Sequence, residues 1–213
     1  MTKRQKLIKK MTSKVAHLEY KAFSVESIGG ADVLADYLHQ AYCTKDAVVQ
    51  LGYVCPHCKG NQFSVDTGTY HNKTRCPTCD TSLVSFWSPS RTQHYFSSKQ
   101  NSLGYLAFDQ GKLIGLIWGF PRTLPSDTKP GLYADMIIIN KELHKTKLGM
   151  GLIFKLTEYF LSGAKAQGYC HMIGRTQIIN APLVSTFKLM GGTEVGPDPS
   201  DPKTRTLWSF SLI

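Results

Sequence analysis

The sequence predicts a mixed α/β protein that carries a small metal-binding insertion. Several short apolar runs have the composition of β-strands, and the long segment 148–167 repeats its apolar residues with the period of a helix. Four cysteines in two short turns predict the insertion. Of the 213 residues, 42% are hydrophobic and 19% charged, so the chain can bury a substantial core.

The net charge of +10 is concentrated near the N-terminus. We predict that residues 1–17 form a basic arm, either a solvated end or a segment that neutralises phosphates or anionic lipid. No apolar run approaches the roughly 20 residues that span a bilayer, and the start lacks the apolar centre of a secretory signal. We therefore expect a cytoplasmic protein without a membrane span. The basic residues of the arm are Lys3, Arg4, Lys6, Lys9, Lys10 and Lys14.

Four of the six cysteines lie in two Cys-Pro-x-Cys turns that 17 residues separate. This spacing is typical of a zinc ribbon, in which a β-hairpin between the turns completes a tetrahedral shell of thiolates. Two disulfides are the alternative, but no feature indicates secretion. Because protein would fill all four positions, the zinc ion is expected to be structural. The ribbon is predicted to cover residues 50–90, with the ligands Cys55, Cys58, Cys76 and Cys79.

The predicted elements follow the order β-α, ribbon, β-β-β-α-β-α-β. A strand at residues 22–28 and a helix at residues 31–42 precede the ribbon. An antiparallel hairpin followed by a crossover helix argues against a wholly parallel nucleotide-binding sheet. After the ribbon, strands are predicted at residues 102–108, 112–120, 131–139, 169–174 and 205–212, and helices at residues 148–167 and 181–190.

The loop before the long helix has the features of a phosphate-binding loop. Gly149 and Gly151 let the backbone approach an anion, and the free amides of the helix start point toward it. The loop has neither the P-loop pattern nor the Gly-x-Gly-x-x-Gly pattern of dinucleotide-binding folds. The alternative is that the two glycines only allow close packing of the helix on the sheet.

In this element order, the segment Thr146-Lys147-Leu148-Gly149-Met150-Gly151 resembles the pyrophosphate loop of the GNAT superfamily of N-acyltransferases, Gln/Arg-x-x-Gly-x-Gly/Ala. Residues 100–213 resemble the main acyl-CoA-binding domain, and residues 18–45 resemble its first strand and helix. The resemblance implies a GNAT-like central sheet with flanking helices and acetyl-CoA as cosubstrate. Thr146 replaces the usual Gln or Arg, and Lys145 and Lys147 could compensate for a lost phosphate contact.

The resemblance also implies that main-chain groups of a splayed central strand pair with the pantetheine arm and polarise the thioester carbonyl. Asp135, two residues before Ile137 on that strand, is then the candidate general base, because the acceptor amine must lose a proton. The alternative for Asp135 is a carboxylate hydrogen-bonded at a strand end. The implied cofactor-binding residues are Ile137, Ile138, Ile139, Lys145, Thr146, Lys147, Leu148, Gly149, Met150, Gly151, Asn180 and Phe187.

Phe187 departs from the family pattern. Many members have a Tyr there that protonates the departing thiolate, and a phenyl ring cannot donate a proton. Three options stay open: water donates the proton, the thiolate leaves unaided, or the domain binds acyl-CoA without efficient catalysis.

The sequence thus supports two functions. The first is an acyl-CoA-dependent N-acyltransferase, an N-acetyltransferase that modifies a primary amine of a small molecule or protein. The alternative is a zinc-ribbon module that binds nucleic acid or protein through the ribbon and basic arm, with a non-catalytic acyl-CoA-binding domain. The identity of the acceptor amine has no sequence signature.

Overall fold

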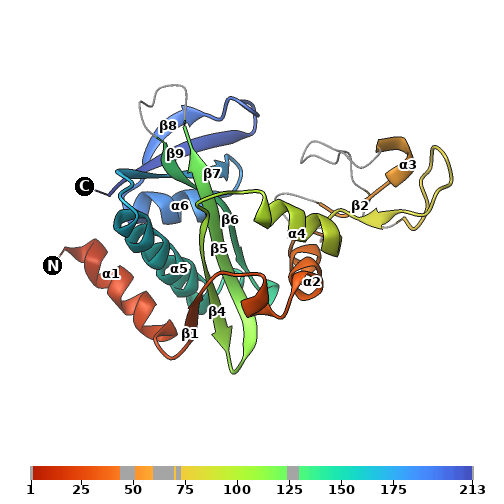
Figure 1. The fold of residues 1–213 in the computed structure, drawn as a ribbon. Helices are drawn as coiled ribbons and strands as arrows, with labels where there is room; N and C mark the ends of the chain where they lie inside the picture. The colour runs from red at the N-terminus through yellow and green to blue at the C-terminus, as the bar shows by residue number, and fades with distance from the viewer. Residues whose placement is uncertain (1, 44–50, 60–69, 71–72, 124–129, 213) are drawn as a thin grey trace. The chain divides into compact units, whose positions relative to one another are not determined.

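The computed structural model describes residues 2–43, 51–59, 70, 73–123 and 130–212. The chain divides into two compact units, and Figure 1 labels the elements of both. The first, here the sheet unit, comprises Met1–Phe23 with Lys99–Ile213. The second, here the cysteine unit, comprises Ser24–Ser98. Each unit is described by itself.

The sheet unit is built on a seven-stranded sheet with the strand order β1-β4-β5-β6-β7-β9-β8. Its neighbouring strands are antiparallel except for β6 and β7, which are parallel. The predicted mixed α/β class is therefore confirmed. The strands are β1 (Glu19–Ala22), β4 (Leu103–Asp109), β5 (Lys112–Arg122), β6 (Gly131–Ile139), β7 (His171–Gln177), β8 (Thr193–Pro197) and β9 (Arg205–Ser211).

Helices α5 and α6 cover one face of this sheet. Ala134 of β6 pairs with Gly119 of β5 and with Gly174 of β7, so a Cβ at any of these three positions points to the same face of the sheet. A Cβ at Gly119 would meet Phe160 of α5, and a Cβ at Gly174 would meet Phe187 of α6. The main apolar core lies under these two helices. The helices of the unit are α1 (Lys3–Thr12), α5 (Lys147–Ala166) and α6 (Ala181–Met190), with short 3-10 turns at Ser13–Val15 and Lys141–Leu143.

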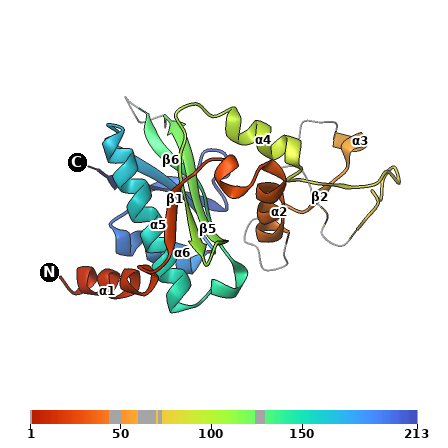
Figure 2. The same cartoon turned by 60° about the horizontal axis from the view of Figure 1, so that its bottom comes forward.

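Residues 3–12, predicted as part of a basic arm, form the helix α1, which packs on α5 (Figures 1 and 2). A capping box begins the helix, because the Thr2 hydroxyl accepts from the Gln5 amide and the Gln5 side chain accepts from the Thr2 amide. At the other end, the helix comes so close to α5 that a Cβ added to Gly151 would lie 2.5 Å from the Met11 carbonyl oxygen. Val15 follows and is fully buried in the main core.

The prediction of a strand at residues 22–28 is wrong. The first strand, β1, ends at Ala22, and a 3-10 turn occupies Glu26–Ile28. Ser24 and Ser27 exchange hydrogen bonds between each amide and the other's hydroxyl, which replaces a strand ladder with a local turn. Gly29, with φ of 104°, then ends the turn in a left-handed conformation.

The cysteine unit has a small core of its own. Leu34 and Leu38 of α2 are buried, as are Phe86 and Trp87 after β3. Its elements are a 3-10 turn (Glu26–Ile28), α2 (Ala31–Tyr42), β2 (Tyr53–Val54), α3 (Pro56–Lys59), β3 (Val84–Ser85) and α4 (Pro89–Ser97). The helix α4, like strand β8 of the sheet unit, was not predicted. The hairpin predicted between the cysteine turns falls largely on residues 60–69 and 71–72, outside the described residues.

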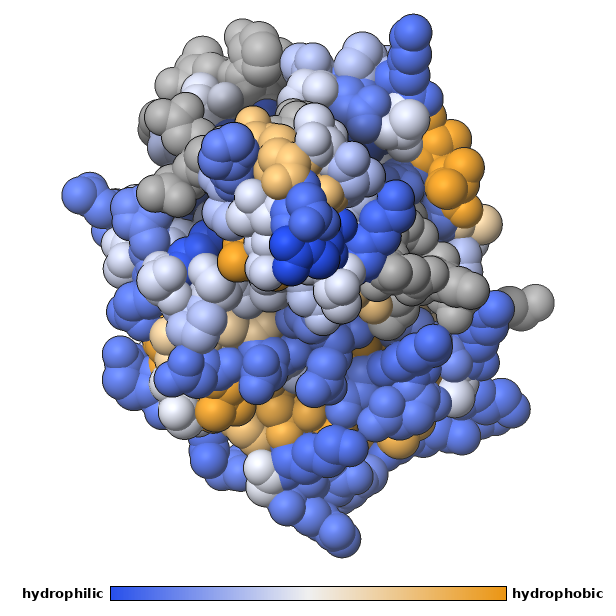
Figure 3. Space-filling model, turned by 90° about the vertical axis from the view of Figure 1, so that its right-hand side faces the viewer, coloured by the Kyte–Doolittle hydropathy of each residue, from blue (hydrophilic) through white to orange (hydrophobic). Residues whose placement is uncertain are grey.

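The surface drawn in Figure 3 is mostly hydrophilic, with a few separate apolar areas. Among the described residues, no helix combines the length and apolar character needed to cross a membrane.

The close approach of β5 and β6 at Gly119 gives a stability test. A Cβ at Gly119 would lie 2.0 Å from the Tyr133 carbonyl oxygen, a backbone atom that cannot move aside. We expect Gly119→Ala to lower the free energy of unfolding by about 3 kcal/mol in urea titrations. Gly115→Ala is the matched control on the same strand. Its Cβ would meet only the ends of Leu152 and Leu156, at 3.1 Å, so it should cost about 1 kcal/mol or less. Equal losses would contradict the explanation.

Candidate functional site

The parallel strands β6 and β7 pair over a short stretch and then separate. Their register joins Leu132–Ala134 to Met172–Gly174 and ends there. Residues 136–139 of β6 continue to pair with β5 on the other side. Past Ala134, the edge of β6 that faced β7 is therefore not paired with any strand of the described residues, and an extended chain could pair with it.

A β-bulge lies at the point where the two strands separate. Trp118 of β5 pairs with Met136, and its neighbour Gly119 pairs with Ala134, so Asp135 is the extra residue on β6. A bulge of this kind reorients the side chain that it carries. It places Asp135 at the apex of the separation.

Arg175 stands opposite Asp135 at this apex. It is the first residue of β7 beyond the paired stretch, and its Nη2 lies 3.8 Å from Oδ1 of Asp135. Its Nη1 lies 3.4 Å from Oδ2 of Asp198, whose side chain is fully buried. The Asp135 and Arg175 side chains are only 12% and 23% exposed, so water screens the pair weakly. One guanidinium thus links two carboxylates.

Burial and neighbouring charges act on the same groups in opposite directions. Burial would raise the pKa of Asp198, but hydrogen bonds from Ser200 and the charges of Arg175 and Arg122 hold it below its usual value. Burial would lower the pKa of Arg175, but Tyr133, Asp135 and Asp198 raise it. Burial, and then the charge of Asp135, raise the pKa of Tyr133 well above its usual range. At neutral pH Asp198 and Arg175 are charged and Tyr133 is a neutral phenol.

The loop before α5 is held by Thr146, the N-cap residue. The Thr146 hydroxyl donates to the Leu143 carbonyl at 2.7 Å and accepts from the Gly149 amide at 2.9 Å. Lys145 precedes it in a left-handed conformation, with φ of 60°. Within the described part of the chain, the amides of Lys147 and Leu148 have no hydrogen-bond partner. Two donors therefore remain at the positive end of a 20-residue helix.

The two glycines of this loop have packing roles. A Cβ at Gly149 would lie 2.0 Å from the Leu143 carbonyl oxygen, and one at Gly151 would lie 2.5 Å from the Met11 carbonyl oxygen. These glycines thus allow close contact with the preceding turn and with α1, whereas the alternative predicted from the sequence was packing of the helix on the sheet. Anion binding at the loop would use the amides of Lys147 and Leu148.

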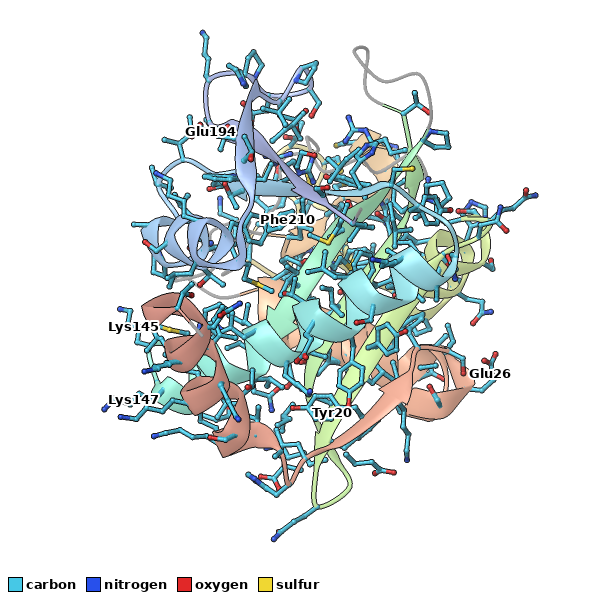
Figure 4. All side chains as sticks on the ribbon, turned by 90° about the vertical axis from the view of Figure 1, so that its left-hand side faces the viewer. Tyr20, Glu26, Lys145, Lys147, Glu194 and Phe210 are labelled. Carbon is cyan, nitrogen blue, oxygen red and sulfur yellow. The ribbon has the colours of Figure 1, made fainter. Side chains whose placement is uncertain are left out.

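Charge around the loop is positive. Figure 4 shows Lys145 and Lys147 directed outward on the side where α1 packs on α5. Both side chains are exposed, as are those of Lys6 and Lys10 on α1. An anion at the loop would meet a positive potential from two elements of the sheet unit.

The other predicted cofactor residues lie on β6 and α6. Ile138 and Ile139 are buried and Ile137 is half-buried, while Met150 is 38% exposed. The Ile139 carbonyl lies 3.1 Å from Nε2 of His144. Cofactor contact by these residues stays a prediction.

Asn180 and Phe187 have clear structural roles on α6. The Asn180 side chain caps the helix, because its Oδ1 accepts from the Leu183 amide at 3.3 Å. Phe187 is 1% exposed and stacks edge-on against Phe210, with ring centroids 5.1 Å apart. The phenyl ring therefore belongs to the main core, and its predicted contact with the cofactor stays a prediction.

Sequence reasoning missed Arg175 and Asp198. The strand predicted at residues 169–174 ended one residue before Arg175, whereas β7 runs to Gln177. Asp198 lies in the turn between β8 and β9, and β8 was not predicted. The local pattern around neither residue shows that the two would meet.

The four predicted metal ligands come together. The Sγ atoms of Cys55, Cys58, Cys76 and Cys79 all lie within 4.8 Å of one another. Three of the separations are 3.4, 3.5 and 3.8 Å. Zinc–sulfur bonds of about 2.3 Å in a tetrahedron would place the sulfurs about 3.8 Å apart, whereas a disulfide requires about 2.05 Å. The cluster fits a tetrahedral zinc ion, and all six cysteines are free thiols.

Local hydrogen bonds shape both cysteine turns for a metal. The amides of Cys58 and Thr78 donate to the sulfurs of Cys55 and Cys76, at 3.3 and 3.4 Å. In the second turn, Arg75 forms a two-bond ion pair with Asp80, at 2.8 and 2.7 Å. The sulfurs of Cys55 and Cys76 are therefore positioned by the protein itself.

The cluster is also joined to the rest of its unit. Nδ1 of His39 on α2 lies 2.9 Å from the Ser85 hydroxyl of β3, and its ring stacks edge-on against Tyr53 of β2. Burial lowers the pKa of His39, although the charge of Asp36 opposes this effect. The neutral imidazole thus connects α2 to β2 and β3, the strands that flank the two cysteine turns.

No protein-family model matches the chain, and no curated protein is significantly similar to it in sequence. Solved structures are similar in fold. Aminoglycoside 6′-acetyltransferase type Ii has a TM-score of 0.56 at 14% identity, over 92% of this chain and 97% of that one. An N-acetyltransferase from Staphylococcus aureus Mu50 has a TM-score of 0.58 at 11% identity, over 93% and 100%.

A candidate acetyltransferase from Salmonella typhimurium, solved with its cofactor acetyl-CoA, has a TM-score of 0.57 at 11% identity, over 92% of this chain and 94% of that one. At such identities the similarity shows the fold. The chain therefore has the fold of the GNAT acetyltransferases, as its loop and element order predict.

The cysteine cluster gives a direct prediction. We expect the purified protein to contain one zinc ion per chain, measured by inductively coupled plasma mass spectrometry. Cys76→Ser should lose most of the metal, because it removes a buried ligand. Cys170→Ser is the control, since Cys170 is exposed and lies outside the cluster. A metal content that Cys76→Ser leaves unchanged would contradict the assignment.

Proposed function

We propose that the protein is an acyl-CoA-dependent N-acyltransferase that transfers an acetyl group from acetyl-CoA to a primary amine. The observation that carries this proposal is the separation of β6 from β7 at Asp135, with the N-terminus of α5 following the far end of β6. The arrangement would give a main-chain edge for the cofactor, an anion site at one end and a carboxylate at the other. The acetyltransferase folds described above support it.

The proposed cofactor path runs along β6. The pyrophosphate would accept hydrogen bonds from the amides of Lys147 and Leu148. The pantetheine arm would follow residues 136–139 toward the apex. Beyond the end of β7, Ile178 and Ile179 are 54% and 81% exposed, which gives an apolar surface next to Asn180 that such an arm could cover.

At the apex the reaction needs a base for the amine, a hydrogen-bond donor for the oxyanion and a proton source for the thiolate. The amine nitrogen attacks the thioester carbonyl carbon, the carbon–sulfur bond breaks, and CoA leaves as a thiolate. Asp135 would accept the amine proton directly or through water, held in place by Arg175. Main-chain amides at the start of the separated stretch of β6 would stabilise the oxyanion. Because Phe187 has no hydroxyl, water is the proposed proton source for the thiolate.

The cysteine cluster is proposed to bind a structural zinc ion, since four protein ligands leave no coordination position for a substrate. The alternative function, a nucleic-acid- or protein-binding module with a non-catalytic domain, relied partly on a separate basic arm. The helix α1 instead packs on α5 in the sheet unit, beside the proposed phosphate loop. Its charges therefore support the cofactor site more directly than a nucleic-acid surface.

The amide of Lys147 gives a sharp test of cofactor binding. Lys147 is the first helical residue, where proline is tolerated, and Thr146 before it is extended, as a residue before proline must be. Lys147→Pro removes the amide donor, while Lys147→Ala removes only the charge. We expect Lys147→Pro to bind acetyl-CoA about 10-fold more weakly than Lys147→Ala in isothermal titration calorimetry. Equal affinities of the two variants would reject the loop as the pyrophosphate site.

Asp135→Asn tests the proposed base. It keeps the size of the side chain but removes its charge, so we expect kcat to fall by about 100-fold. The affinity for acetyl-CoA should change by less than about 3-fold, because no cofactor contact is assigned to this side chain. Turnover is followed as CoA thiol released from acetyl-CoA with a panel of primary amines. An unchanged kcat would remove Asp135 from the mechanism.

A further inference from the structure

The sheet has a second, smaller cluster on the face opposite α5 and α6. Tyr133, Ile173 and Leu207 are buried there, with Phe120 packed against them. Each alternates along its strand with residues of the main core, so the cluster lies on the other face. Tyr133 precedes Asp135 by two residues, which places the cluster next to the apex.

The Tyr133 hydroxyl is buried without a partner. The residue is 2% exposed, and its Oη has no hydrogen-bond partner among the described residues. A buried hydroxyl in this state costs about 1–3 kcal/mol, so such groups often mark a place that a ligand completes. Its raised pKa keeps it protonated, able to donate and to accept one hydrogen bond.

Two guanidinium groups lie near the Tyr133 ring, and they differ in their partners. Arg175, 5.7 Å from the ring centroid, is paired with Asp135 and Asp198. Arg122, 4.8 Å from the centroid, forms no ion pair or hydrogen bond within the described residues. The charge of Arg122 nevertheless acts on the ionisable groups here, because it helps to lower the pKa of Asp198.

The local charge balance is positive. Lys99 lies 4.9 Å from the ring centroid of Phe120, which itself stacks edge-on against Tyr133. Among the described residues, the contacts at this cluster thus bring three cations, Lys99, Arg122 and Arg175, near two carboxylates, Asp135 and Asp198. A ligand that approaches Asp135 from this face would therefore meet one carboxylate for its amine and an excess of positive charge beyond it.

We propose that Arg122 and Tyr133 form the acceptor subsite and that the acceptor is a primary amine that also carries an anionic group. This inference rests on the proposed function. The Arg122 guanidinium binds the anionic group in a two-bond geometry, and the Tyr133 hydroxyl donates to it. Tyr133 and Asp135 are two residues apart on a strand, about 7 Å, so several bonds separate the amine from the anion.

The chemistry at the amine is that of the proposed transfer. The amine nitrogen bonds to the acetyl carbon, the carbon–sulfur bond breaks, the amine proton passes to Asp135, and the CoA thiolate takes a proton from water. Arg122 and Tyr133 take no part in these bonds. Their effect is on binding of the acceptor, and so on KM.

Matched amines test the subsite with the full chain. The carboxylate pair is 4-aminobutyrate and 4-aminobutanamide, and the phosphate pair is phosphoethanolamine and ethanolamine. With acetyl-CoA and a thiol-release assay, we expect at least one anionic amine to exceed its neutral partner by about 10-fold in kcat/KM. The pair that shows the preference identifies the anionic group as carboxylate or phosphate.

Variants separate recognition from folding. Arg122→Gln should raise KM for the anionic amine by about 10-fold and change kcat by less than about 3-fold, and Arg122→Lys should retain part of the preference. Lys21→Gln is the control, because Lys21 also stacks on an aromatic ring, Phe108, but at β1. Its kinetics should match the wild type.

Tyr133→Phe distinguishes a ligand-binding hydroxyl from a structural one. It should raise KM for the anionic amine without lowering the melting temperature, because the hydroxyl has no partner to lose among the described residues. A loss of thermal stability with unchanged KM would assign the hydroxyl to the fold instead.

Three results would overturn the subsite: equal kcat/KM within both pairs, a preference that survives Arg122→Gln, or acetylation of neither amine set by protein that binds acetyl-CoA. The last leaves the cofactor assignment intact. Failure of the wild type to bind acetyl-CoA in calorimetry would instead overturn the proposed function, and this inference with it.

Discussion

The bulge at Asp135 and the end of the β6–β7 register at Ala134 and Gly174 are the constraint on which the site depends. A continuous parallel ladder would consume the main-chain groups along the end of β6, and no extended ligand could bind there. The bulge requires β5 to come very close to Tyr133, which Gly119 permits by its lack of a Cβ. The same local distortion places a carboxylate at the apex. One irregularity in a regular sheet therefore lies where β6 loses its pairing with β7 and also carries the candidate base.

Arg175 determines what the apex can do chemically. A carboxylate and a guanidinium that are mostly removed from water gain from each other and from further hydrogen bonds, but the pair adds little net stability to a fold. The role of the Asp135–Arg175 pair is instead to hold the Asp135 carboxylate in position. Asp198, buried and held by Ser200, fixes one side of the guanidinium and leaves the other for Asp135. The acceptor-side charge then comes from Arg122, whose guanidinium is not committed to any carboxylate of the described residues.

The parts of the fold with strong periodicity could be predicted from the sequence. The strand Gly131–Ile139 and the helices Ala31–Tyr42 and Ala181–Met190 match to the residue, because each has an unbroken apolar pattern and clear ends. The spacing of the cysteines alone was enough to predict which four sulfurs come together. The helix α1 was missed because its charges suggested a solvated arm, although Thr2 and Gln5 form a readable capping box. The bulge and the Arg175 contacts depend on strand register, which no local pattern contains.

The two glycines of the loop before α5 show why packing and anion binding are not competing explanations. Because Gly149 has no Cβ, its backbone can pack against the Leu143 carbonyl. The Thr146 hydroxyl stabilises this turn with two hydrogen bonds. The Thr146 hydroxyl accepts from the amide of Gly149, and the amides of Lys147 and Leu148 keep no hydrogen-bond partner among the described residues. Gly151 admits the end of α1, and the basic residues of that helix come with it. Tight packing thus produces the loop's free amides and gathers the positive charge around them.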